Sequence, residues 1–253
     1  GSVDYWSVHS IESVTAGQVI AVYHHAVSGE DGMSVKGGLV PAKHGREQMP
    51  LKGKGFDRMD DEVTYTASMD GKIEMQNDRI VVLPVHEVSG NAELAEGNID
   101  FRGDIVIHGN VESGVNIRAT GSITIDGVAE ACMLEAGKDI ILRGGMLGGN
   151  KASVKTKGAI TAKFFEFTNI LCEGDLQADV LMDCSVICHG QIRLTGRKGS
   201  IIGGKVQAIR GLIATSLGND AEKRTEIFVG AGIDVYSRLR VMEKKIETTR
   251  EEL

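Results

Sequence analysis

A short repeat occurs eight times between Ile99 and Val235, and it constrains the fold more than any other feature of the chain. Each copy has two short halves in which apolar or small residues alternate with other residues, and about three turn residues, usually including Gly, separate the halves. The copies begin 16 to 21 residues apart, at Ile99, Ile117, Leu134, Val154, Ile170, Val186, Val206 and Ile227. A recurring pattern that tolerates small insertions is typical of a stacked repeat.

Alternation with a period of two predicts strands with one buried face. A repeat of this length is too short for a strand–helix unit, which needs about 30 residues, but it suits one coil of a parallel β-helix. The turn glycines, such as Gly121 and Gly190, are expected to supply backbone angles that let the chain turn sharply. Residues 91–236 are therefore predicted to form a right-handed parallel β-helix of about eight coils, with strands stacked about 4.8 Å apart.

The segments on either side lack this repeat. Residues 3–90 contain short alternating segments divided by Gly- and Asp-rich turns, which predict a small all-β module, a barrel or a sandwich. Residues 237–253 are rich in Arg, Glu and Lys, and Leu239, Met242 and Ile246 recur at helical spacing, which predicts an amphipathic helix. Two roles are open for this helix: a cap on the last coil, or the first part of a longer coiled coil.

Composition suits a narrow aliphatic core and argues against several function classes. Aromatic residues make up 4% of the chain, which fits a thin solenoid filled by Ile, Val, Leu and Ala. The net charge of −7 argues against nucleic-acid binding, because phosphate neutralisation needs a basic face. No apolar run approaches the roughly 18 residues of a membrane-spanning helix, and no secretory signal is evident, so we expect a cytoplasmic protein.

The repeat places the four cysteines of the chain. Cys172 and Cys188 occupy the same position in consecutive coils and are expected to stack in the core. Cys132 and Cys184 each lie two residues before the start of a copy, three coils apart. This arrangement offers no four-ligand zinc cluster, and the histidines are scattered, so we predict buried, reduced thiols and no metal site.

Two coils are lengthened by similar insertions, and the second insertion is a candidate binding loop. It runs from Gly196 to Lys205 and joins two cations to glycines whose backbone N–H groups would be exposed, a combination that suits an anion or a protein partner. The alternative is that glycine only permits the corner and that the cations are solvated. The candidate residues are Arg197, Lys198, Gly199, Ser200, Gly203, Gly204 and Lys205.

The aromatic residues Phe164, Phe165 and Phe167 are a second candidate contact. Alternation along a strand predicts that at least one of these rings faces outward, where it would contact a protein partner. Packing at a widened corner of that coil explains the aromatic run equally well, and both interpretations stay open.

Carboxylates follow the turn glycine in several coils, at Asp104, Asp139 and Asp175, which invites comparison with β-helical enzymes that act on polysaccharides. Such enzymes need paired carboxylates or a carboxylate–metal cluster on one outer face. Other coils have Ser122 or Ala159 at the equivalent position, so a turn in which Asp accepts a backbone hydrogen bond is the simpler explanation. We predict no catalytic, metal-binding or cofactor-binding residue.

Three segments carry a resemblance to a known family. They are Gly97-Asn98-Ile99-Asp100-Phe101-Arg102-Gly103-Asp104-Ile105, Gly121-Ser122-Ile123-Thr124-Ile125-Asp126-Gly127-Val128 and Lys198-Gly199-Ser200-Ile201-Ile202-Gly203-Gly204. With these segments, residues 14 to about 235 resemble the flagellar assembly protein A family. The resemblance implies a bacterial cytoplasmic protein with a right-handed β-helix, a role in polar flagellum assembly and no established catalytic activity.

We therefore expect a non-enzymatic scaffold that supports polar flagellum assembly through protein–protein contacts on the β-helix. The expected partners are flagellar or polar assembly factors, which would recruit the protein to the cell pole, and a second copy of the chain is a further candidate. We expect no cofactor, no nucleic acid and no membrane span. The alternative is a carbohydrate-binding or carbohydrate-active β-helix, which would show acidic and aromatic residues converging in a groove on the long sheet.

Overall fold

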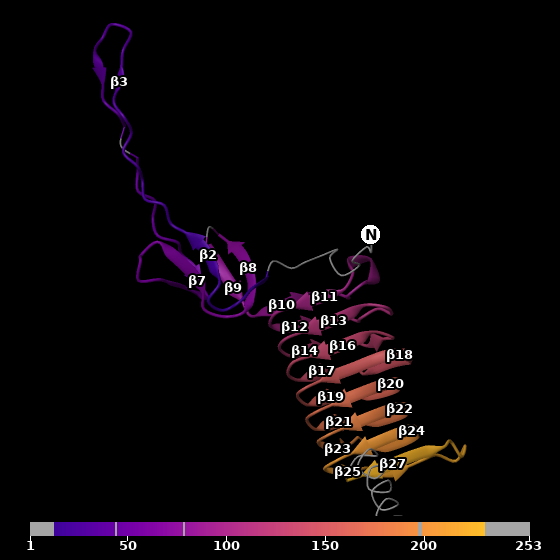
Figure 1. Cartoon of the computed structure of the whole chain (residues 1–253). Helices are drawn as coiled ribbons and strands as arrows, with labels where there is room; N and C mark the ends of the chain where they lie inside the picture. Colours follow the sequence, from indigo (N-terminus) through magenta and orange to yellow (C-terminus); the bar gives the residue numbers. More distant parts are fainter. Residues whose placement is uncertain (1–12, 44, 78, 197–198, 231–253) are drawn as a thin grey trace, which may run out of the picture. The chain divides into compact units, whose positions relative to one another are not determined.

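The computed structural model describes residues 13–43, 45–77, 79–196 and 199–230. The chain divides into two compact units, one ending at Pro84 and the other beginning at Val85. The described part of the chain is built from β-strands, with one short 3₁₀ turn at Leu94–Glu96 (Figure 1). The helix predicted for residues 237–253 lies outside the described residues.

The first unit is all-β, as its alternating segments predicted. Its strands form a four-stranded sheet, a three-stranded sheet and a separate two-stranded hairpin. Val14, Ala67 and Val82, from both larger sheets, form a small core, with Ile20 and Ile73 packed against it. In sheet order the strands are β1 (Ser13–Val14), β8 (Gly71–Gln76), β9 (Arg79–Leu83) and β5 (Gly53–Lys54); β2 (Val19–Val22), β7 (Thr64–Ala67) and β6 (Phe56–Arg58); and β3 (Gly32–Met33) and β4 (Leu39–Val40).

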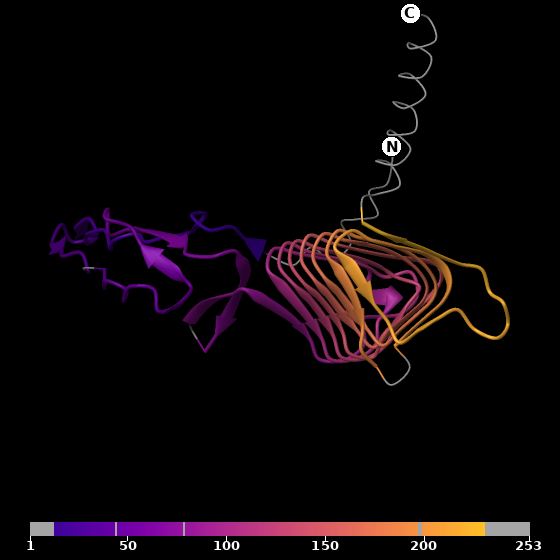
Figure 2. The ribbon, with the colours of Figure 1, turned by 90° about the horizontal axis from the view of Figure 1, so that it is seen from below.

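The second unit is a parallel β-solenoid of about eight turns, as the repeat predicted (Figure 2). Neighbouring coils pair in parallel to form an eight-stranded and a ten-stranded sheet. The eight-stranded sheet contains β10 (Val85–Val88), β12 (Asp104–Ile107), β14 (Ile123–Ile125), β17 (Ile140–Leu142), β19 (Ile160–Ala162), β21 (Leu176–Ala178), β23 (Gln191–Leu194) and β25 (Gly211–Ile213). Because β10 pairs with β12, the solenoid begins at Val85 rather than at residue 91.

The ten-stranded sheet contains most of the longer strands. It runs through β11 (Ile99–Phe101), β13 (Asn116–Ala119), β16 (Met133–Ala136), β18 (Met146–Thr156), β20 (Phe164–Cys172), β22 (Val180–Cys188), β24 (Ser200–Ala208) and β26 (Ser216–Leu217). Two further strands join this path from the side: β15 (Ala129–Glu130) pairs with β18, and β27 (Thr225–Val229) pairs with β24.

The core consists of ladders in which each coil contributes one similar side chain. Ile123, Ile140 and Ile160 are in register on neighbouring strands and fully buried, which confirms the alternation predicted for the second half of the repeat. Ile117 and Leu134 are also in register and buried, which confirms the alternation predicted for the first half. Each fully buried aliphatic side chain contributes about 1.5–3 kcal/mol, so the coils are stable as a stack although no single coil has a core of its own.

A third inward ladder was not predicted. It runs through Ala129, Met146, Phe165, Leu181 and Ile201, which are in register and fully buried. The first parts of the long strands carry these residues, so each coil has three sides rather than two. The part of each strand that forms this side is only two or three residues long and contributes one inward side chain per coil. A segment this short shows no alternation that a sequence pattern could reveal.

A sharp corner divides the long strands into the third side and the side that carries the first repeat half. Phe167, Asp183 and Gly203 occupy this corner in successive coils, and their φ angles are 46°, 50° and 70°. Left-handed backbone angles are uncommon for residues other than glycine. They let each strand change direction within one residue while it keeps its pairing with the coils on either side.

The other corner shows why the repeat needs its turn glycine. A Cβ atom on Gly121, Gly158 or Gly190 would lie 2.0 to 2.4 Å from Oδ1 of the Asp in the coil before, namely Asp104, Asp139 or Asp175. The φ angles of these three glycines are not in the left-handed region. The predicted explanation, that glycine supplies unusual turning angles, is therefore wrong here, because glycine is needed for space.

The carboxylates at this corner hold successive coils together. Asp104 Oδ1 accepts the backbone N–H of Ser122 at 2.7 Å, and Asp175 Oδ1 accepts that of Gln191 at 2.8 Å. Asp139 makes the equivalent bond to Ala159, at 2.7 Å. The expected hydrogen bond is present, but it reaches the next coil rather than the same turn. These three side chains serve the stack and do not converge on an outer catalytic site.

Candidate functional site

The outer face of the ten-stranded sheet carries a ladder of charged side chains that the sequence pattern did not predict. Asp100, Arg118, Glu135 and Lys155 occupy equivalent outward positions on β11, β13, β16 and β18. Leu171 takes this position on β20. The ladder therefore changes from charged to apolar after four coils.

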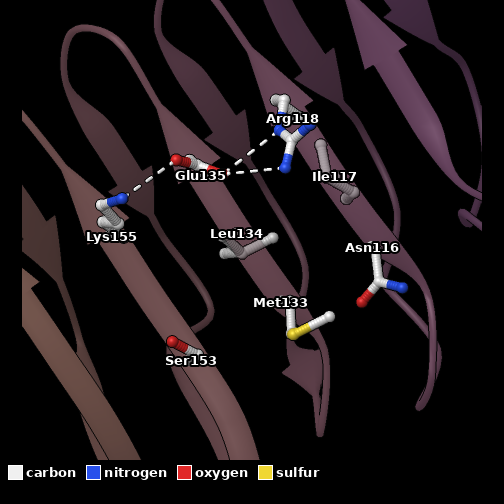
Figure 3. Close-up of a pocket in the computed structure, with 8 residues that line it drawn as sticks. All are labelled: Asn116, Ile117, Arg118, Met133, Leu134, Glu135, Ser153 and Lys155. Carbon is white, nitrogen blue, oxygen red and sulfur yellow. Dashed lines mark hydrogen bonds and ion pairs between the residues drawn. The ribbon is translucent and has the colours of Figure 1, made fainter.

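Ion pairs join the charged members of the ladder, and Figure 3 shows those that Glu135 makes with Arg118 and Lys155. Arg118 Nη2 and Lys155 Nζ lie 3.2 and 3.3 Å from the two carboxylate oxygens of Glu135, and Asp100 lies 3.9 Å from Arg118. The hydrogen bond from Lys155 holds the pKa of Glu135 below its usual range. Exposed pairs of this kind contribute at most about 1 kcal/mol each, and an ionised Glu135 cannot act as a general acid at neutral pH.

A second row of outward side chains runs beside the charged ladder. It contains Asn116, Met133 and Ser153, and a shallow depression lies between the two rows (Figure 3). A neighbouring depression extends past Lys155 to Leu171 and is lined there by Lys157 and Glu173. These open surfaces differ from the enclosed, mostly apolar pockets that hold small molecules. They suit contact with another polypeptide.

The predicted binding loop at residues 196–205 is largely strand, which corrects the expectation of an exposed loop. Ser200–Ala208 form β24, and Ile201 and Lys205 pair with Leu181 and Ser185 of β22. Ser200 is buried. The extra residues of this coil lie before Ser200, where the carbonyl of Gly199 accepts a hydrogen bond from the N–H of Thr215.

The other described residues of the predicted binding loop do not lie together in one exposed loop. Gly203 and Gly204 have φ angles of 70° and 81° and form the sharp corner of their coil. Lys205 is exposed on the outer face of the ten-stranded sheet, with Nζ 5.5 Å from the centroid of the Phe228 ring. Arg197 and Lys198 lie outside the described residues. An anion site at this loop stays a prediction.

The three phenylalanines do not form one exposed patch. Phe165 is fully buried in the third ladder, which corrects its inclusion as a candidate contact. The ring of Phe164 lies over Gly145, where a Cβ atom would be 2.5 Å from Cδ1 of the ring. Phe167 is half-buried at the sharp corner, and Lys223 Nζ lies 5.6 Å from its ring centroid. Packing thus accounts for Phe164 and Phe165, and a partner contact at Phe167 stays a prediction.

The cysteines lie where the repeat placed them. Cys172 and Cys188 are in register and fully buried, and Cys132 and Cys184 are buried three coils apart on another ladder. The Cys172 thiol donates to the carbonyl of Gly158 at 3.3 Å, as the Thr156 hydroxyl of the coil before donates to the carbonyl of Lys138. In this corner Cys therefore acts as a small side chain that also satisfies a buried turn carbonyl.

Burial should make the thiols of Cys132 and Cys184 unreactive in the folded protein. It raises the pKa of Cys132 to about 12 and that of Cys184 to about 11, so both stay protonated at pH 8, and the thiolate is the reactive form. We expect a disulfide reagent at pH 8 to label Cys132 and Cys184 only as the protein unfolds in urea. Because the folded pKa values exceed the unfolded ones, stability should also fall as pH rises from about 9 towards 12. Fast labelling without urea would contradict the buried placement.

Neither a metal-binding cluster of side chains nor a membrane-spanning helix occurs among the described residues. They contain no group of three or more His, Cys, Asp or Glu side chains placed to hold a metal ion. Within the same ranges, no helix has the length and apolar character needed to cross a membrane.

Comparison with known proteins agrees with this architecture. A family model described as the flagellar assembly protein A beta solenoid domain matches residues 84–253, which begins where the structure divides the chain. A model described as the N-terminal region of the same protein matches residues 1–78. No curated protein matches the chain, and no solved structure does. The two family models together cover nearly all of the sequence, and the chain therefore belongs to the flagellar assembly protein A family.

Proposed function

We propose that this protein is a non-enzymatic scaffold in flagellum assembly and that the outer face of its ten-stranded sheet is the surface that contacts protein partners. The observation that supports this most directly is a pair of uncovered aliphatic side chains in register on that face. Leu171 is 37% exposed and Ile187 is 42% exposed. Exposed apolar groups within a polar surround are typical of interaction sites.

A rigid platform favours such a role. Side-chain hydrogen bonds from Asp104, Asp139 and Asp175 join successive coils, and buried ladders fill the interior. The outward side chains are therefore held at fixed spacings of about 4.8 Å from coil to coil. A partner that binds such a surface does not have to order it first, which lowers the entropic cost of association.

The carbohydrate alternative has less support. The depression beside the charged ladder is lined by Asn116, Arg118, Met133, Glu135 and Ser153, among others, and none of its lining residues is aromatic. Its carboxylate is already bound by two cations. Sugar recognition on this face would require stacking aromatic rings beside free carboxylates, and neither lies in this depression.

The test is complementation of a deletion strain of a flagellated bacterium that encodes this chain. The strain receives either the gene with Leu171→Glu and Ile187→Glu or the same gene with Thr161→Glu and Gln177→Glu. The second pair is the control, because it is also outward and in register, but on the eight-stranded sheet. We expect the first variant to lose flagella and the second to keep them, at equal protein levels. Normal flagellation with both variants would refute the proposed contact face.

A further inference from the structure

We propose that this face binds an acidic, amphipathic segment of a partner protein, which lies along a diagonal from Lys157 to Lys205. The inference rests on the proposed role of the face as a contact surface and adds the chemistry of the partner. Two exposed aliphatic residues, Leu171 and Ile187, form the middle of the diagonal, and an exposed lysine stands at each end.

Strand register defines the diagonal. Leu171 pairs with Lys155 on one side and with Ile187 on the other, and Lys157 follows Lys155 by two residues. Lys205 pairs with Ser185, which precedes Ile187 by two residues. The diagonal therefore crosses three strand spacings and four residues along the strands. At the usual spacings of about 4.8 Å between strands and 3.3 Å per residue, its length is about 20 Å.

The lysines at the two ends differ from the cations of the neighbouring ladder. Arg118 and Lys155 are bound by Glu135. Within the described part of the chain, no ion pair joins Lys157 or Lys205 to a carboxylate. Among the described residues, neither ammonium group therefore has a carboxylate partner, and Lys205 Nζ lies 5.5 Å from the centroid of the Phe228 ring.

Charge complementarity favours an acidic occupant. Acidic groups at both ends of the bound segment would face Lys157 and Lys205, and its apolar side chains would cover Leu171 and Ile187. Two carboxylates flank the diagonal, because Glu173 lies beside Lys157 in the next coil and Glu226 pairs in register with Lys205. They would repel acidic groups of a partner that extend beyond the two lysines. Complementary charges steer association and suppress wrong partners. A helix of about 13 residues spans about 20 Å and presents an apolar stripe at spacings of three and four residues.

The experiment uses the full chain and two labelled helical peptides. Both peptides carry the same Leu and Ile stripe, one with Glu at its ends and the other with Lys, and binding is followed by fluorescence anisotropy at low salt. We expect the acidic peptide to bind at least about tenfold more tightly than the basic one. The double variant Lys157→Glu and Lys205→Glu should reverse this preference. Arg193→Glu, an outward charge reversal on the eight-stranded sheet, should leave it unchanged.

Several outcomes would overturn the inference. The first is no binding of the acidic peptide up to about 1 mM. The second is equal binding of the two peptides, and the third is a preference that survives the double reversal. Binding to vesicles of anionic lipid, lost in the double variant, would instead identify a membrane surface as the occupant and would also overturn it. Loss of flagella in the Leu171 and Ile187 variant without an acidic preference would refute this inference alone, whereas an acidic preference with normal flagellation would refute only the proposed function.

Discussion

Replacing Gly190 by Ala is expected to destabilise the solenoid by about 3 kcal/mol. The added Cβ would lie 2.3 Å from the carbonyl oxygen of Gly174 and 2.4 Å from Asp175 Oδ1 in the coil before. A backbone carbonyl cannot move aside cheaply, so the two coils must separate at this corner. Separation would also weaken the hydrogen bond from the Gln191 N–H to Asp175. Urea denaturation followed by far-UV circular dichroism measures the loss, and amide hydrogen exchange at Gln191 should locate it.

Gly90→Ala is the matched control. A Cβ at Gly90 would meet no atom within 4 Å, and the residue has no left-handed φ angle. The substitution should be neutral or stabilise the fold by up to about 1 kcal/mol, because Ala restricts the unfolded chain more than Gly does. A similar loss of stability at both positions would show that close stacking is not why glycine recurs at the turns.

The close contact at the turn glycine also explains why the repeat tolerates coils of different length. The stacking of Gly190 on Gly174 and Asp175 involves only the turn and its neighbour in the coil before. Extra residues elsewhere in a coil leave that contact unchanged. The insertion before Ser200 lengthens its coil, yet β24 keeps its register with β22. Pairing from coil to coil, and not a constant period, thus preserves the fold.

Two sides of each coil could be predicted from the sequence because their signal is local. Ile123 and Ile125 alternate with polar residues, and so do Ile192 and Leu194, which identifies a buried face without knowledge of the coil above or below. The third side gives no such signal. Phe165 is the one inward residue in the short part of β20 before the sharp corner, and only pairing with the neighbouring coils shows that it belongs to a ladder.

The candidate surface could not be predicted for a related reason. Arg118, Glu135 and Lys155 are separated by 17 and 20 residues, and they become neighbours only when the register of three coils is known. Glycine was misleading in a different way. Gly203 and Gly204 suggested a loop, but they occupy the sharp corner of a strand, where Asp183 stands in the coil before.

Phe165→Ala is expected to destabilise the fold by about 3–5 kcal/mol, the usual loss when a large buried aromatic side chain is truncated. Phe165 is fully buried and stacked in register between Met146 and Leu181. Main-chain pairing with both neighbouring coils keeps the walls of the resulting cavity from closing, so the higher end of the range is expected. Urea denaturation followed by far-UV circular dichroism measures this loss of stability, and increased amide exchange should be centred on β18, β20 and β22.

Phe167→Gly, two residues further along β20, is the control for Phe165→Ala. It also removes a phenylalanine ring, but one that is only half-buried, so the two variants separate the effect of burial from that of losing an aromatic side chain. Phe167 is half-buried and has a φ angle of 46°, which costs a residue with a Cβ about 1–2 kcal/mol and costs glycine nothing comparable. Its removal loses partial packing and the contact with Lys223, so the two effects should cancel to within about 1 kcal/mol. A larger loss at Phe167 than at Phe165 would show that the sharp corner, and not the third ladder, holds this part of the solenoid together. If the fold instead tolerates Phe167→Gly, any loss of partner binding in that variant can be assigned to the missing ring.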